Sequence, residues 1–107
     1  MITSAHVHTM ARYNKWQNEN LYACADRLTD EERKRERGAF FGSIHKTLNH
    51  LLWGDHIWLH RFAGTPRPEG GIPDSLDCFQ SWDELKRERV AFDAVIIGWA
   101  GKLDARW

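Results

Sequence analysis

Apolar residues recur every three or four positions in three stretches of the chain, residues 4–28, 43–63 and 81–103. This spacing is typical of amphipathic helices, because it places the apolar side chains on one face of each helix. No stretch shows the strict alternation of a β-strand. The pattern therefore predicts an all-α protein with three long helices. The apolar face of the first helix is made of Val7, Met10, Ala11, Leu21, Ala25 and Leu28.

Polar residues and helix breakers separate these stretches. Ser81 with Glu84 and Thr29 with Glu32 form capping boxes, in which each side chain bonds the backbone N–H of the other residue. The second of these predicts a short helix directly after Thr29. Residues 64–80 contain all three prolines and three glycines, so we expect a long irregular loop there.

Length, charge and tryptophan content limit the class of protein. With 107 residues the chain is long enough for one domain, residues 1–107. Lys and Arg together number 15, as do Asp and Glu, so the formal net charge is zero. This balance argues against a nucleic-acid partner and leaves little repulsion between copies of the chain. Six tryptophans favour dense packing or an interface, because indole rings bury much apolar area.

The apolar runs and the cysteines bear on where the protein is found. The first residues show no long apolar run and no cleavage signature, and no stretch reaches the roughly 18 apolar residues that span a membrane. Cys24 and Cys78 form no CxxC motif, and we interpret them as reduced thiols that behave as small buried residues. Sequence alone leaves a disulfide between them open. We therefore predict a cytoplasmic protein without a membrane partner.

Residues 43–63 carry a wide apolar face with one carboxylate, Asp55, near its middle. A buried carboxylate needs a partner, because an unpaired charge in an apolar environment is costly. Three roles fit Asp55: it caps a helix end, pairs with Arg89, or holds the ring of a metal-binding histidine. With residues spaced about 100° apart around the helix, the other members of this face are Leu48, Leu51, Leu52, Trp58, Leu59 and Phe62.

Histidines on the flanks of the same helix are candidates for metal ligands. His56 and His60 are four residues apart and could reach one ion, although the same spacing fits two surface imidazoles. His50 lies on the other flank, beside an apolar strip formed by Trp53 and Ile57. Because this strip lies away from the main apolar face, we expect another helix or another chain to cover it.

Two asparagines, Asn14 and Asn18, interrupt the apolar stripe of the first helix. In one interpretation their amides lie at the solvated edge of the helix or bond a neighbouring helix, since a buried amide needs hydrogen-bond partners. In the other, both side chains face a polar pocket. The spacing does not decide between the two.

Several segments together resemble the DinB family, whose members are also described as DinB/YfiT-like metalloenzymes. The resemblance covers nearly the whole chain, and it is most specific in the patterns YNxW…N and TLNHLLWGDxIWL. It is carried by YNKWQNENLY (13–22), EERKRERGAFFGSIHKTLNHLLWGDHIWLHRF (31–62), the PRP connection and SWDELKRERVAFDAVI (81–96).

The resemblance implies a bacterial four-helix bundle with up-down-down-up topology that is usually dimeric. Many members hold a divalent ion, often nickel or zinc, with three histidines. His50 matches the ligand of the second helix, whereas the other two ligands come from an HxxxH motif on a fourth helix. Related members are thiol-dependent enzymes, including bacillithiol transferases and mycothiol-dependent maleylpyruvate isomerases.

The sequence departs from that pattern at KLDARW (102–107), where it stops at about the end of the family's third helix, so we expect the fourth helix and its two histidines to be missing. We therefore expect a bundle truncated to three long helices and a metal site that His50 alone leaves incompletely liganded. The pair of His56 and His60 has the right spacing but faces another way. In such a site Asp55 would orient the ligand ring, and Asn14 and Asn18 would line the pocket.

These observations support more than one function. The first hypothesis is a DinB-like metal-dependent protein, related to thiol-dependent transferases or hydrolases, with a small-molecule or thiol substrate. The alternatives are a non-catalytic helical protein that associates with itself or with a partner, and a truncated member of the family. In either of the first two cases we expect a homodimer, in which helices of two chains bury the uncovered apolar strips.

Overall fold

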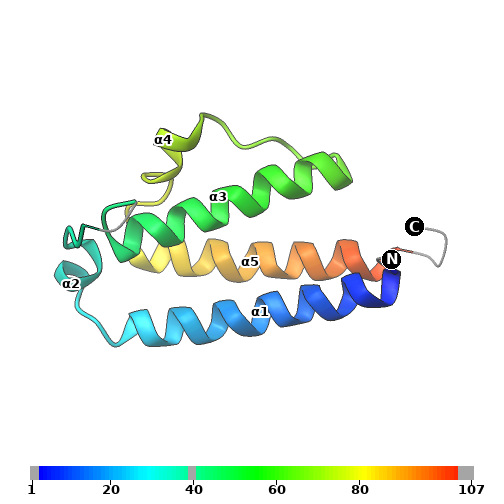
Figure 1. Cartoon of the computed structure of the whole chain (residues 1–107), viewed down its shortest axis with the longest axis horizontal. Helices are drawn as coiled ribbons and strands as arrows, with labels where there is room; N and C mark the ends of the chain where they lie inside the picture. Colours follow the sequence, from blue (N-terminus) through cyan, green and yellow to red (C-terminus); the bar gives the residue numbers. More distant parts are fainter. Residues whose placement is uncertain (1–2, 39–40, 104–107) are drawn as a thin grey trace.

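The computed structural model describes residues 3–38 and 41–103, and the regular elements in this part of the chain are helices (Figure 1). The all-α prediction is confirmed, whereas the four-helix bundle is not established by the three long helices seen here. The outer residues of the predicted domain lie outside the described part. The helices are α1 (Ser4–Asp26), α2 (Asp30–Lys34), α3 (Ile44–Ala63), α4 (Ile72–Ser75) and α5 (Trp82–Gly101).

The helix boundaries follow from local capping. The Thr29 hydroxyl accepts from the Glu32 N–H at 3.1 Å, and the Glu32 carboxylate accepts from the Thr29 N–H at 3.0 Å, so the capping box predicted for α2 is present. Ser81 accepts from the Glu84 N–H at 3.4 Å at the start of α5. Gly64 ends α3 in the left-handed conformation, at a φ of 70°. The one-turn helix α4 lies within residues 64–80, where the sequence predicted only a loop.

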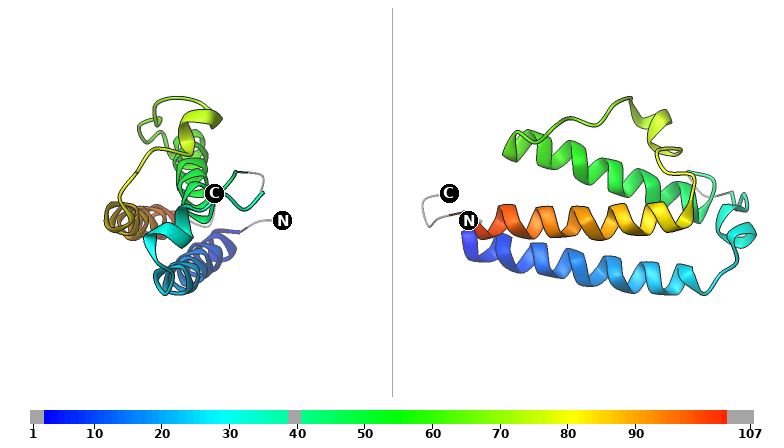
Figure 2. Two further views of the ribbon diagram at one scale, coloured as in Figure 1. Left: turned by 90° about the vertical axis from the view of Figure 1, so that its left-hand side faces the viewer. Right: turned by 180° about the vertical axis from the view of Figure 1, so that it is seen from behind.

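Helices α3 and α5 run in the same direction, and α1 runs opposite to both (Figure 1). Two parallel helices that follow each other in sequence need a connection that returns along their length. Residues 64–81 provide it, and α4 within them packs on α3. Helix α5 packs against both α1 and α3, and the end-on view in Figure 2 shows the three helices at the corners of a triangle.

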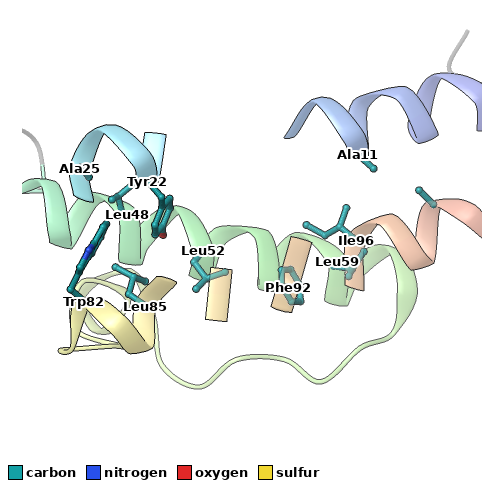
Figure 3. Close-up of a cluster of buried hydrophobic side chains, with 11 residues drawn as sticks. Ala11, Tyr22, Ala25, Leu48, Leu52, Leu59, Trp82, Leu85, Phe92 and Ile96 are labelled. Atoms are coloured by element: carbon teal, nitrogen blue, oxygen red, sulfur yellow. The ribbon is translucent and has the colours of Figure 1, made fainter. Parts of the chain in front are cut away.

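The hydrophobic core lies where α5 meets its two neighbours (Figure 3). Leu52, Leu59 and Leu85 are almost wholly buried. At one end of the core the rings of Tyr22 and Trp82 stack with their centroids 5.3 Å apart. This burial of large apolar side chains from three helices supplies the main driving force for their packing.

Part of the predicted apolar surface is not buried. Met10 and Leu21 are about half exposed, because α1 turns Ala11, Tyr22 and Ala25 towards the core instead. On α3 the predicted apolar face is divided. Leu48, Leu52 and Leu59 are buried, but Leu51, Trp58 and Phe62 are 47–52% exposed, because α1 and α3 pack on α5 and hardly on each other.

The end of the long connection is held on α3 by a fully buried amide. Asn49 accepts from the Phe79 N–H at 2.8 Å and donates to the Phe79 carbonyl at 2.9 Å, and a ring N–H of His45 donates to the same carbonyl at 2.7 Å. These bonds give the backbone N–H and carbonyl of Phe79 hydrogen-bond partners on α3. They place residues 64–81 against the flank of α3 that carries His50.

Two further predictions concern the cysteines and the membrane. Cys24 and Cys78 are free thiols, as we interpreted them, but both are exposed, so the prediction that they are buried was wrong. Cys24 lies on α1 outside the stripe that meets α5, and Cys78 lies in the loop after α4. Among the helices of residues 3–38 and 41–103, none combines the length and apolarity that a membrane crossing requires.

Candidate functional site

His50 lies on the flank of α3 that faces α4, and its ring is oriented by a buried serine. Its Nδ1 is 2.8 Å from the hydroxyl oxygen of Ser75, a residue with no exposed surface. The Ser75 hydroxyl donates its own hydrogen to the Ile72 carbonyl. The serine oxygen must then accept from His50, which puts the proton of the neutral ring on Nδ1. The lone pair of Nε2 is thereby left for another partner.

Two aromatic rings, those of Phe41 and Trp53, lie close to the ring of His50. The Phe41 ring stacks on His50 with centroids 4.1 Å apart, and the Trp53 ring lies 5.9 Å away at 28°. The Trp53 indole N–H donates to the Glu69 carbonyl at 3.4 Å. Trp53 and Ile57 are both of intermediate exposure, and Trp53 is partly covered by the connection of the same chain. Coverage of the strip by a second chain stays a prediction.

Among the described residues, the donors around His50 do not form a metal centre. Over residues 3–38 and 41–103, no group of three or more His, Cys, Asp or Glu side chains comes close enough to hold an ion. Tight transition-metal sites use three or four ligands. For a nickel or zinc ion, the described residues therefore offer one ligand atom, Nε2 of His50.

His56 and His60 do not converge on a common point. The ring of His56 stacks on Phe92 of α5 with centroids 3.6 Å apart. His60 donates through Nδ1 to the Thr65 carbonyl at 2.6 Å, just after the end of α3. His56 therefore contributes to helix packing and His60 to the end of its helix, and neither lies free on the surface as the solvent-facing interpretation implied.

Burial and the nearby Arg89 guanidinium lower the pKa of His56. The unfolded chain therefore binds a proton at this ring at a higher pH than the folded chain does. Above about pH 6.5, the pKa of a free imidazole, protonation of His56 does not change the stability of the fold. As the pH falls from there towards the folded pKa, stability is lost.

Urea denaturation at about pH 7.5 and about pH 5.5 measures this effect, with the window set around the free-imidazole pKa. The control is His56→Phe, which keeps a ring against Phe92 but cannot titrate. We expect the wild-type chain to lose more stability on acidification than the variant does. Equal losses in both chains would contradict a role for His56.

Asp55 pairs with Arg89, one of the three roles that its position allowed. Arg89 Nη2 donates to Asp55 at 2.6 Å and to Asp93 at 2.7 Å, and Arg89 Nε donates to Asp93 at 3.0 Å. Asn18 donates to the same Asp93 oxygen at 3.0 Å, so this amide bonds a neighbouring helix. The predicted role of Asp55 in orienting a ligand histidine is wrong for His50, whose ring is held by Ser75.

The network contains two carboxylates for one guanidinium. Arg89 and Asp93 are almost wholly buried, whereas the Asp55 side chain is 36% exposed. Burial raises the pKa of Asp93, and it also raises the pKa of the neighbouring Tyr22, so Tyr22 stays a neutral phenol. With both carboxylates ionised the network has a net charge of −1, and its accessible part is Asp55.

A groove of about 460 Å³ opens between α1 and α3 above α5. Asp55 and Asn14 are among its lining residues, so these two predicted pocket residues do share a pocket, without His50 and without Asn18. Trp58, Phe62 and Trp99 form an aromatic cluster in the same groove. The ring centroids of Trp58 and Phe62 are 4.6 Å apart. The indoles of Trp58 and Trp99 pack edge to face, with their centroids 5.9 Å apart.

The fold and these sites define an all-helical protein with two parallel helices joined by a long return connection and one oriented histidine beside that connection. The model of the DinB family matches residues 1–104, and the chain belongs to the DinB family. A search of the curated proteins and a search of the solved structures gave no match to the chain.

Proposed function

We propose that this DinB-family protein binds a divalent metal ion between two copies of the chain, with Nε2 of His50 as the ligand from each copy. The observation that carries the proposal is the hydrogen bond from His50 to Ser75. Histidines that bind metals commonly donate their other ring N–H to a fixed acceptor, which selects the tautomer and orients the lone pair. Ser75 is such an acceptor, and it is buried in the connection that packs on α3.

A second copy would add a second imidazole to the one that the described residues offer. One imidazole alone binds an ion weakly. Two imidazoles are fewer than the three protein ligands of a usual catalytic zinc site, so water or substrate would occupy the remaining positions. Zero net charge leaves little repulsion between copies. Such an ion would act as a Lewis acid, and the reactions that we propose for it are transfer or hydrolysis involving a thiol. The tautomer with its proton on Nδ1 leaves the lone pair of Nε2 for the ion.

The test is titration of the purified chain with Zn²⁺ and with Ni²⁺ by calorimetry, combined with sedimentation velocity. We expect one ion for two chains and a sedimentation coefficient that rises when the ion is added. His50→Ala should abolish both changes. Ser75→Ala should weaken binding by about 10–100-fold, because the ring loses its acceptor.

His60→Ala is the matched control, since it removes another imidazole of α3 and should leave binding unchanged. Unchanged binding in His50→Ala would refute the proposal. So would an ion bound to a monomer with one-to-one stoichiometry.

A further inference from the structure

The groove between α1 and α3 is independent of the His50 site. Asp55 follows His50 by five residues, which places the two side chains about 140° apart around the helix. The groove volume of about 460 Å³ lies in the range of small-molecule sites, roughly 300–1,000 Å³. Its lining is largely apolar with few polar groups, among them Asp55 and Asn14, the composition typical of sites for small amphipathic ligands.

The electrostatics of the groove select a cation. Arg89 bonds both Asp55 and Asp93, so a single positive charge serves two negative ones. Asp93 is almost wholly buried, whereas Asp55 lines the groove and is partly exposed. With both carboxylates ionised, the uncompensated negative charge is therefore accessible at Asp55. Because the surrounding walls are apolar, a cation placed there would interact more strongly than it does in bulk water.

The aromatic cluster lies on the same face of α3 as Asp55. Trp58 and Phe62 follow Asp55 by three and seven residues, the spacing that aligns side chains along one side of a helix. Both rings are about half exposed, and together with Trp99 they border the groove. Aromatic faces attract organic cations and also pack on apolar groups. The Asp55 carboxylate thus suits the charged end of a ligand, and the adjacent aromatic rings suit its apolar end.

We propose that the groove binds a small organic ammonium ion with an aromatic or aliphatic body. The ammonium group contacts Asp55 and the amide oxygen of Asn14, and the body packs against Trp58, Phe62 and Trp99. A neutral apolar ligand would fill the groove but leave the charge of Asp55 unmatched. The site is distinct from His50 and does not depend on a metal ion.

The experiment compares two probes of similar shape, 2-phenylethylammonium and 2-phenylethanol, by calorimetry and tryptophan fluorescence with the full chain. Both probes are measured in one buffer at about pH 8. We expect the ammonium ion to bind at least about tenfold more tightly than the alcohol. Asp55→Asn should reduce its affinity to that of the alcohol. Asp83→Asn, which removes an exposed carboxylate of α5, should not change it.

Circular dichroism tests whether the Asp55→Asn variant is folded. If the variant is unfolded, the comparison of the two probes on the wild-type chain still tests the proposal. A second variant, Trp58→Leu, should weaken both probes. Equal affinity of the two probes for the wild-type chain would refute the proposal, as would an Asp55→Asn variant that binds like the wild type. Failure of the folded wild type to bind the ammonium ion, including through closure of the groove by a second copy, would also refute it.

Discussion

Replacement of Arg89 by Met should lower the free energy of unfolding by about 3–5 kcal/mol, because it leaves a buried carboxylate without its cation. The Arg89 side chain is 3% exposed and makes three hydrogen bonds to Asp55 and Asp93. Met fills similar space but donates none of them. A domain of this size has a total stability of about 5–15 kcal/mol, so the variant should lose a large share of its stability.

The control for this prediction is Arg87→Met, two residues earlier on an exposed part of α5, which should change stability by less than about 0.5 kcal/mol. Urea denaturation followed by circular dichroism measures both variants. Acid should reduce the difference between Arg89→Met and the wild type, because protonation of Asp93 removes the unpaired charge. A loss below about 1 kcal/mol at neutral pH would show that Arg89 is not needed to neutralise Asp93.

Truncation of Leu59 to Ala should cost about 2–5 kcal/mol, the range for removing a large side chain from a well-packed core. Leu59 has no exposed surface and belongs to the buried cluster drawn in Figure 3. The loss combines the transfer free energy of the removed atoms with the cavity that remains. The same urea titration gives the value.

Leu51→Ala provides the matched comparison, since it makes the same chemical change on the same helix. Leu51 is 47% exposed, and we expect a loss well below that of Leu59→Ala. The sequence pattern places both leucines on one apolar face and predicts similar losses. If both variants lost the same free energy, Leu51 would be buried by association of the chain in solution, and dilution of the protein should then reduce the difference from wild type.

The long helices were predictable because their signals are local. The capping box of Thr29 and Glu32 and the hydroxyl of Ser81 lie within three residues of the groups they bond. Even so, the structure ends α1 at Asp26 and α5 at Gly101, two residues before the predicted ends. Helix α4 escaped prediction because it is a single turn among prolines and glycines, where periodicity gives no signal.

The candidate sites were predictable only in part. His50, Asp55 and Asn14 were named from their positions, and pairing of Asp55 with Arg89 was one of the roles considered. Ser75 was not predicted as a partner of His50, because it lies 25 residues away in a segment without regular spacing. The only available signal was its position after a proline in a connection long enough to return along α3.

The sequence by itself determined the helices and their apolar faces, because capping and periodicity act within a few residues. Only the tertiary structure decided which half of each face is buried. Helix α5 covers one side of α3 and of α1, and the other side of α3 is left to form a groove with Trp58 and Phe62. Which side chains meet depends on how whole helices are rotated and packed against each other, and the repeat of apolar residues along one helix does not contain that information.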